Sequence, residues 1–427
     1  MKRHPPFLRS AKKLFPLETY AGLDRSIYVL FAARVVNSTG NFIFPFLTMF
    51  LTLKLSFAAA EAGSYLLLCS LSQVPGSLLG GRLADRGGRK RVLLLFQALS
   101  AVSVLPCAFL GNPLLVPWLL ILASFFLGAV HPVTSAMLTD LTPPAKRKQA
   151  FSLLYLGQNI GFALGPLIAG FLFLHHTPWI FLGDAATTLA SLLFILLFVS
   201  ESRPSPEAVE KSLSEDRGPE RAEKGPLLYV LWRRPFVLAF LLVQVLFSFV
   251  YAQAGFSLPL QLSAFFGEQG PQRFGLLMSV NGLVVIFLTT PFIYITERVN
   301  PLLSVSLAGI LYALGFGVIP LIRGMGLFVL STAVWTLGEI LWATNSNVYI
   351  AGHTPMSHRG RFNSIAPIMT RAGNALSPPL MGAFIERFGV ARVWPIMLCL
   401  ASLGAALLLL LHFFERGEGP GRFRWPG

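Results

Sequence analysis

Charged side chains are scarce in this chain of 427 residues. Only 12% of its residues are Asp, Glu, Lys or Arg, whereas soluble globular proteins carry about 25%. Hydrophobic residues make up 54%, and the mean hydropathy is +0.66. These values exclude an ordinary soluble fold, because most of the chain must contact lipid or other apolar helices.

Acidic residues and cysteines are few as well. The chain has 19 acidic and 34 basic residues, which gives a net charge of +15. No basic stripe with interleaved aromatic residues lies outside the apolar segments, so we expect no nucleic-acid partner. The three cysteines, Cys69, Cys107 and Cys399, all fall inside apolar segments, and we therefore expect no loop disulfide.

Catalytic motifs are missing too. The sequence has no P-loop, no H-E-x-x-H and no G-x-S-x-G, so we expect neither an enzyme nor a cofactor or metal site. Without a nucleotide site, a proton or ion gradient is the available energy source.

Long apolar segments are what the chain does contain. About 20 apolar residues cross a bilayer as a helix, because backbone groups in lipid must bond within their own segment. The sequence therefore predicts an all-α membrane protein of twelve transmembrane helices in two six-helix halves. The predicted spans are 27–50, 59–80, 92–110, 115–139, 151–174, 179–199, 236–258, 274–295, 302–322, 327–348, 363–385 and 394–414.

The distribution of Lys and Arg predicts the orientation. With the N-terminus inside, 27 of the 34 lie on cytoplasmic segments, five on the outer side and two within spans. This bias places both termini in the cytoplasm and the chain in the inner (plasma) membrane, in contact with lipid.

One polar stretch, 201–226, is rich in Glu, Lys, Arg, Ser and Pro and has no apolar period. It reads as a disordered or loosely helical linker between the halves. The predicted parts are an N-terminal tail (1–26), a six-helix bundle (27–200), a linker (201–232), a second bundle (233–414) and a C-terminal tail (415–427).

The two halves match at a fixed offset of 212 residues. Duplicated halves place a binding site at their interface, near the midplane. The matching pairs include Gly63 with Gly275, Asp85-Arg86 with Glu297-Arg298, Pro143 with Pro355, Arg147 with Arg359, Ser152 with Ser364, Gly161 with Gly373, Pro166 with Pro378, and Gly170 with Gly382.

The loop at 81–91 reads G-R-L-A-D-R-G-G-R-K-R. It resembles the signature loop of the major facilitator superfamily, and this resemblance implies that Asp85 latches the halves on the cytoplasmic side in the outward-facing state. Alternatively, the basic residues only enforce topology. We take Asp85, Arg86, Gly88 and Arg89 as candidates for a conformational gate.

Two further motifs support the resemblance. The segment 140–147, with Asp140 and Arg147, resembles the family's D-x-x-P-x-x-x-R loop; we add both residues and the repeat partner Arg359 to the gate. The helix at 151–174 resembles a motif of proton-driven exporters, although plain small-residue packing is the alternative. Its candidate residues are Gly161, Gly165, Pro166 and Gly170. Ser124 stands where such exporters often carry an Arg, so that residue's proton-coupling role is not carried over.

Ionisable residues inside spans are functional candidates, because their burial in lipid is costly. Glu339 lies near the middle of 327–348, as a site for a proton or a cationic substrate or as a structural partner of a buried Arg. Arg34 and Arg371 either serve the cavity or anchor their helices, and Asp184 either takes part in coupling or reaches headgroups near the outer surface.

Polar and aromatic residues near two prolines are candidates for a cavity lining. The resemblance implies that the first and seventh helices line the cavity, and Pro45 and Pro259 occupy similar places in the two halves. The candidates are Asn37, Asn41, Phe44, Pro45, Phe256 and Pro259.

The sequence favours a monomeric, proton-coupled exporter of lipophilic or drug-like small molecules that works by alternating access. One alternative is a proton symporter that imports a sugar, peptide or organic acid. A second, of another class, is a membrane receptor or sensor, although no signalling domain is recognisable.

Overall fold

The computed structural model describes residues 20–110, 115–143, 146–202, 235–296, 299–353 and 359–418. Side chains at 148, 347, 351–353, 359–366 and 416–418 are outside this description, as is nearly all of the predicted linker. Every regular element in the described part of the chain is a helix, which confirms the predicted all-α fold class.

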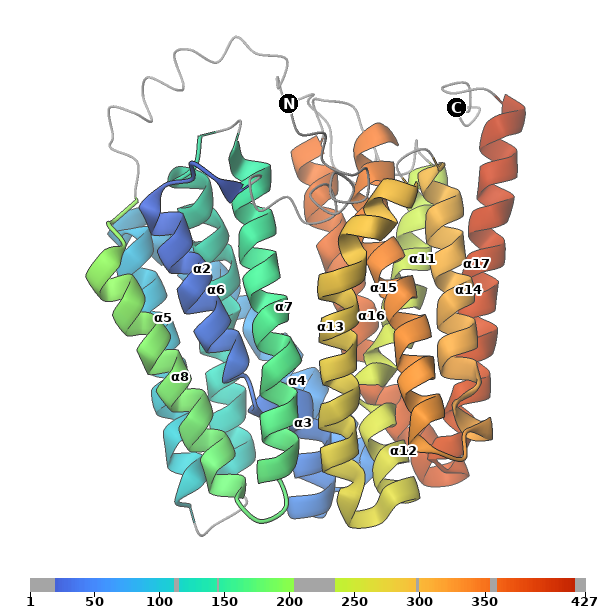
Figure 1. The fold of residues 1–427 in the computed structure, drawn as a ribbon, viewed down its shortest axis with the longest axis horizontal. Coiled ribbons are helices and arrows are strands. Elements are labelled where there is room, and N and C mark those ends of the chain that lie inside the picture. The colour runs from blue at the N-terminus through green and yellow to red at the C-terminus, as the bar shows by residue number, and fades with distance from the viewer. Residues whose placement is uncertain are drawn as a thin grey trace, which may run out of the picture. The chain divides into compact units, whose positions relative to one another are not determined.

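The first half forms six helical spans, of which the first is interrupted. Figure 1 shows α2, α5, α6, α7 and α8 side by side, and α2 packs against both α7 and α8. The elements are α2 (Arg25–Thr39), α3 (Ile43–Met49) continued by the π-helical η2 (Phe50–Lys54), α4 (Ala59–Gly87), α5 (Arg89–Val104) with the 3-10 turn η3 (Leu105–Ala108), α6 (Leu115–Asp140), α7 (Arg147–Leu172) and α8 (Thr177–Phe198).

The second half repeats this plan. Its α11 packs against α16 and α17, and α14 packs against α15 and α17. The elements are α11 (Pro235–Tyr251), the 3-10 turn η5 (Ala252–Ala254), α12 (Ser257–Phe266), η6 (Gly267–Gln269), α13 (Gly270–Thr296), α14 (Pro301–Gly317), η7 (Ile319–Leu321), α15 (Met325–His353), α16 (Arg359–Phe388), η9 (Val390–Arg392) and α17 (Val393–Glu418).

Each of the twelve predicted spans coincides with helix in the structure. Nine helical runs in the described part are long and apolar enough to cross a membrane, and one of them, Pro235–Thr296, contains two predicted spans. The other two predicted spans lie in α4 and α16, which are less apolar. Many large apolar side chains are exposed, such as Leu197 at 62% and Phe198 at 48%, as expected for helices that face lipid.

The first span differs from its prediction. The sequence predicts one helix over 27–50, but α2 ends at Thr39 and α3 begins at Ile43. Gly40 is a weak helix former, and Pro45 has no N–H to donate to the carbonyl four residues earlier. The chain therefore restarts its helix so that Pro45 falls in the first turn, where that donor is not needed.

The described residues group into two compact units that do not follow the halves strictly. The first unit takes most of the first half together with 262–291, and the second takes 58–64 with most of the second half. Close helix contacts explain the exchange, since α13 packs against α7 and the start of α4 packs against α16. The bundle limits at 27–200 and 233–414 stay a prediction.

Candidate functional site

The loop between α4 and α5 is held by a compact charge network. Gly88 joins the two helices with a φ of +103°, a conformation that favours glycine. The guanidinium of Arg89 pairs with Asp85 and also with Asp140 of α6, at 3.0 Å from Nε to Oδ2. Asp85 remains 68% exposed, while Arg89 and Asp140 are 16% exposed. Three of the predicted gate residues therefore meet at one point.

Glu201, shortly after the end of α8 at Phe198, completes this network. Its Oε1 accepts hydrogen bonds from the backbone N–H groups of Arg89 (2.6 Å) and Lys90 (3.1 Å) at the start of α5. Partial burial opposes its charge, but these backbone donors outweigh burial and lower the pKa of Glu201. A Cβ added at Gly88 would lie 2.5 Å from Oε2, so a larger residue here would displace this flexible carboxylate. Sequence reasoning missed Glu201; its signal was an acid that follows a span and faces a basic loop.

The remaining gate candidates are less well placed. Arg86 is exposed at the end of α4, and Arg147 is exposed at the first residue of α7. Arg359 begins α16, but its side chain lies outside the described residues. A latch between the halves through Asp85 stays a prediction, since the described partner of Asp85 is Arg89.

The glycines of α7 allow backbone contacts with two other helices. A Cβ added at Gly161 or Gly165 would lie 2.4 Å from Ser38 Cβ and 2.6 Å from the Thr39 carbonyl oxygen, respectively. Gly170 meets the backbone of α13, with the Pro271 carbonyl oxygen at 2.8 Å from such a Cβ. The motif on α7 therefore packs against the end of α2 and against α13.

The repeat is visible in these contacts. A Cβ at Gly275 would lie 2.3 Å from the Pro166 carbonyl oxygen, and one at Gly63 would lie 2.3 Å from that of Pro378. The members of both pairs correspond at the offset of 212. The same backbone contact is therefore made once by α7 with α13 and once by α4 with α16.

The ionisable residues inside the spans occupy separate places. Arg34 donates from Nη2 to Gln158 Oε1 at 2.6 Å, which ties α2 to α7. Asp184 on α8 accepts hydrogen bonds from the backbone N–H groups of Phe42 and Ile43, at the interruption of the first span. Arg371 is exposed on α16. Arg34 and Asp184 are thus not paired with each other.

Glu339 lies on α15 beside a cluster of aromatic rings. It is partly buried, and Trp335 and Trp342, four residues before and three after it, share its side of the helix. The ring of Tyr251 lies 6.0 Å from Trp335 and 6.2 Å from Trp342, and Tyr312 is 6.2 Å from Trp342. Gly338 lets α15 approach the Ala308 carbonyl of α14 closely.

The predicted cavity residues divide by burial. Asn37 accepts a hydrogen bond from Thr188 at 3.4 Å, and it is partly buried, as are Asn41, Phe44 and Pro45. Phe256 and Pro259 are buried, so their side chains pack inside the fold in this conformation.

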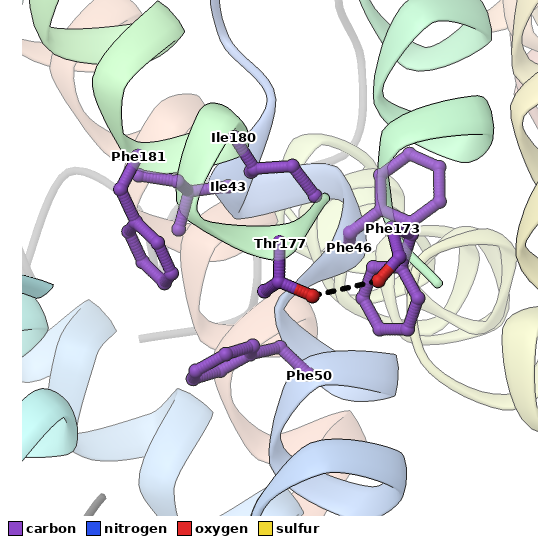
Figure 2. Close-up of a pocket in the computed structure, with 7 residues that line it drawn as sticks. All are labelled: Ile43, Phe46, Phe50, Phe173, Thr177, Ile180 and Phe181. Carbon is purple, nitrogen blue, oxygen red and sulfur yellow. Dashed lines mark hydrogen bonds between the residues drawn. The ribbon is translucent and has the colours of Figure 1, made fainter. Parts of the chain in front are cut away.

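A small apolar cavity lies where α3, α7 and α8 meet (Figure 2). Its volume is about 10 Å³, and the one hydrogen bond drawn there joins Thr177 Oγ1 to the Phe173 carbonyl at 2.8 Å. Such a space has about the volume of one water molecule and excludes a drug-sized ligand. Its lining residues are Ile43, Phe46, Phe50, Phe173, Thr177, Ile180 and Phe181.

The family follows from the sequence as a whole. A profile of the Major Facilitator Superfamily matches residues 30–378. The chain belongs to this superfamily. It is therefore a multi-pass membrane transporter of small molecules and not an enzyme, as the loop at 81–91 and the repeated halves indicate.

Relatives within the superfamily include antiporters and efflux pumps. A Na(+), Li(+), K(+)/H(+) antiporter of Planococcus maritimus is 26% identical over 420 residues, which cover 92% of this chain and 97% of that protein. Quinolone resistance protein NorA of Staphylococcus aureus is 24% identical over 412 residues, covering 93% and 98%. The crystal structure of the peptide transporter POT in complex with sulfate has a TM-score of 0.73 at 16% identity, covers 93% of this chain and 95% of that chain, and shows the fold alone.

Proposed function

We propose that this transporter is a monomeric, proton-coupled antiporter that exports lipophilic or drug-like compounds by alternating access, with both termini in the cytoplasm. The two relatives above support an exchange mechanism, since one is named as a cation/proton antiporter and the other as a resistance protein.

The surroundings of Glu339 carry the proposal. A carboxylate attracts a cationic substrate, and aromatic faces bind both apolar groups and cations. Trp342, which shares its side of α15 with Glu339, and the neighbouring Tyr251 are partly buried and can supply such faces, whereas Trp335 is buried and stacks on Phe316. This combination suits an amphipathic cation better than a sugar, which needs several polar partners.

Exchange of substrate for protons follows when the same acid binds either the cationic substrate or a proton, but not both at once. Ionised Glu339 binds the substrate from the cytoplasm, and protonation from the more acidic outer side removes that attraction. A ligand shifts the conformational equilibrium only by its different affinity for the two states. Arg34, Arg371 and Asp184 are further candidates for coupling in this scheme.

The test uses inverted membrane vesicles loaded with a proton gradient and a panel of cationic dyes. Glu339→Gln mimics the protonated acid, so it should abolish gradient-driven dye uptake and leave residual binding nearly independent of pH. Glu268→Gln changes an exposed glutamate and is the matched control, with wild-type uptake expected. Wild-type uptake by Glu339→Gln would contradict the role of Glu339, and uptake only in right-side-out vesicles would indicate a symporter instead.

A further inference from the structure

The first span of each half is interrupted at equivalent positions. The break between α2 and α3 covers residues 40–42, and η5 separates α11 from α12 at Ala252–Ala254. These segments correspond at the offset of 212 that relates the halves. The second break is therefore an internal comparison for the first.

Neutral side chains close the second break. Gln253 donates from Nε2 to Ser377 Oγ, Ser257 donates to Gln253 Oε1 at 2.5 Å, and Ser377 donates to the Phe249 carbonyl at 2.8 Å. All three side chains are buried. An interruption of this kind thus needs no charged residue to satisfy its polar groups.

The first break is closed differently. The positions that correspond to Gln253, Ser257 and Ser377 hold Asn41, Pro45 and Gly165, and the last two have no side chain that can take part in such a network. Asp184 of α8 bonds to the backbone there instead. The counterpart helix α17 has no acidic or basic residue from Val393 to Phe414, apart from His412. The acid at the first break therefore has no counterpart at the second.

One oxygen of this acid is unsatisfied. Oδ2 of Asp184 is buried and has no hydrogen-bond partner among the described residues. A buried oxygen of this kind is costly unless a proton, a cation or a hydrogen-bond donor occupies it.

Among the described residues, no basic side chain compensates Asp184. None of the ion pairs found in the described part of the chain includes it. The basic groups on the elements that surround it are engaged or exposed elsewhere: Arg34 bonds Gln158, Lys54 bonds the Leu174 carbonyl, Arg89 pairs with Asp85 and Asp140, Lys90 bonds the Leu196 carbonyl, and Arg25, Arg91, Arg147, His175 and His176 lie at helix ends.

Neutral oxygen atoms gather around the same break. A Cβ at Gly40 would lie 1.6 Å from Thr187 Oγ1, which places this hydroxyl against the end of α2. Thr188 and Asn37 meet one turn away. The carbonyl end of α2 carries partial negative charge, and such half-helix ends are favourable places for a small cation.

We propose that Asp184 and the break of the first span form a binding site for one monovalent cation, at which a proton and an alkali-metal ion compete for Oδ2. A single positive charge neutralises the single carboxylate, whereas a divalent ion would leave excess charge in an apolar setting. This inference rests on the proposed antiport function. It adds that an alkali-metal ion is one of the ions exchanged for protons. The site lies in the first unit, and Glu339 lies in the second.

Competition between a proton and an alkali-metal ion can be measured as proton release, without any transport assay. Full-length protein in detergent and weakly buffered solution receives NaCl, LiCl or KCl, with choline chloride at equal ionic strength as the reference. At least one alkali salt should release up to about one proton per protein, and the half-maximal salt concentration should rise about tenfold for each unit fall in pH while the site is protonated. Asp184→Asn should release none, and Glu268→Gln should match the wild type.

A second measurement requires no variant to fold. A hydrophobic carbodiimide labels protonated carboxyl groups, and mass spectrometry of the wild-type protein should find Asp184 labelled at low salt and protected by the alkali salt that releases protons. Absence of release with all three salts, release retained in Asp184→Asn, or labelling of Asp184 that salt does not change would each overturn the proposal. Failure of dye export alone would reject the proposed function and leave this binding result standing.

Discussion

A single carboxylate connects the end of α8 to the start of α5. Glu201 accepts from the first backbone N–H groups of α5, where the helix dipole favours an anion, and Gly88 leaves the space that this approach needs. Arg89 is thereby held at the position from which it reaches Asp85 and Asp140. The loop at 81–91 depends on a residue 110 or more positions further along the chain.

Replacement of Glu201 by Gln should lower stability by about 0.5–1 kcal/mol near neutral pH, because the helix start loses an anionic cap. The folded-state pKa is lowered, so the stabilisation is fully present above the ordinary glutamate value of about 4.3 and is lost as the pH falls through the folded value. Melting curves in detergent should therefore separate wild type from Glu201→Gln near pH 7 and converge in acid. Equal curves at pH 7, or a gap as wide in acid, would contradict this, and Glu268→Gln is the control.

At the scale of the elements, the tightest glycine contact in the described part of the chain is the packing of α8 against the interruption of the first span. Here α8 approaches the chain so closely that Gly40 has no room for a side chain beside Thr187. Gly183 likewise meets the ring of Phe42, since a Cβ there would lie 2.6 Å from Cε2. Glycines on both sides therefore allow the break and α8 to pack closely against each other.

Gly40→Ala should destabilise the protein by about 1–3 kcal/mol, as overpacked sites do. Thr187→Gly removes the atoms that the new methyl group meets, so the double variant should recover part of the loss in spite of a helical glycine. Thermal unfolding followed by tryptophan fluorescence gives both values. Gly326→Ala, in open space on α15, should be close to neutral. Equal effects of Gly40→Ala and Gly326→Ala would show that this contact is not tight.

The spans could be predicted because each is a continuous apolar segment of sufficient length. The loop at 81–91 could be recognised because its motif residues are contiguous in the sequence. The break was not predicted, although Gly40 and Pro45 are its local signals. The expectation that Asp184 lies close to the outer surface stays a prediction, but its contact with the backbone of Phe42 and Ile43 was not expected. Which backbone groups a buried acid meets depends on how α8 packs against α2, and no local pattern contains that information. Glu201 was missed in part for the same reason, since its place after a span is visible in the sequence but its contact with the start of α5 is not.

At the scale of the whole molecule, the duplication is expressed as equal backbone contacts. Gly63 with Pro378 and Gly275 with Pro166 give the same 2.3 Å separation from an added Cβ to a carbonyl oxygen. Gly382 with Ala59 and Gly170 with Pro271 form the next pair of equivalents, at 2.3 and 2.8 Å.

Gly63→Ala and Gly275→Ala should therefore lower the melting temperature in detergent by similar amounts, each corresponding to about 1–3 kcal/mol. A backbone carbonyl cannot rotate aside as a side chain can, so neither site relaxes easily. Gly326→Ala again serves as the reference. If one variant is neutral while the other unfolds, the two contacts are not energetic equivalents.

These paired contacts restrict how the two copies of an ancestral half can diverge. Where two backbones are in contact, only glycine leaves enough space, so both copies must retain glycine at these positions. Where side chains close a break, the copies are free to drift apart, and one has a Gln-Ser-Ser network while the other has an aspartate. Substitutions that change what a descendant transports should accordingly accumulate at the breaks and be rare at the glycines, a pattern that a comparison of orthologues can count.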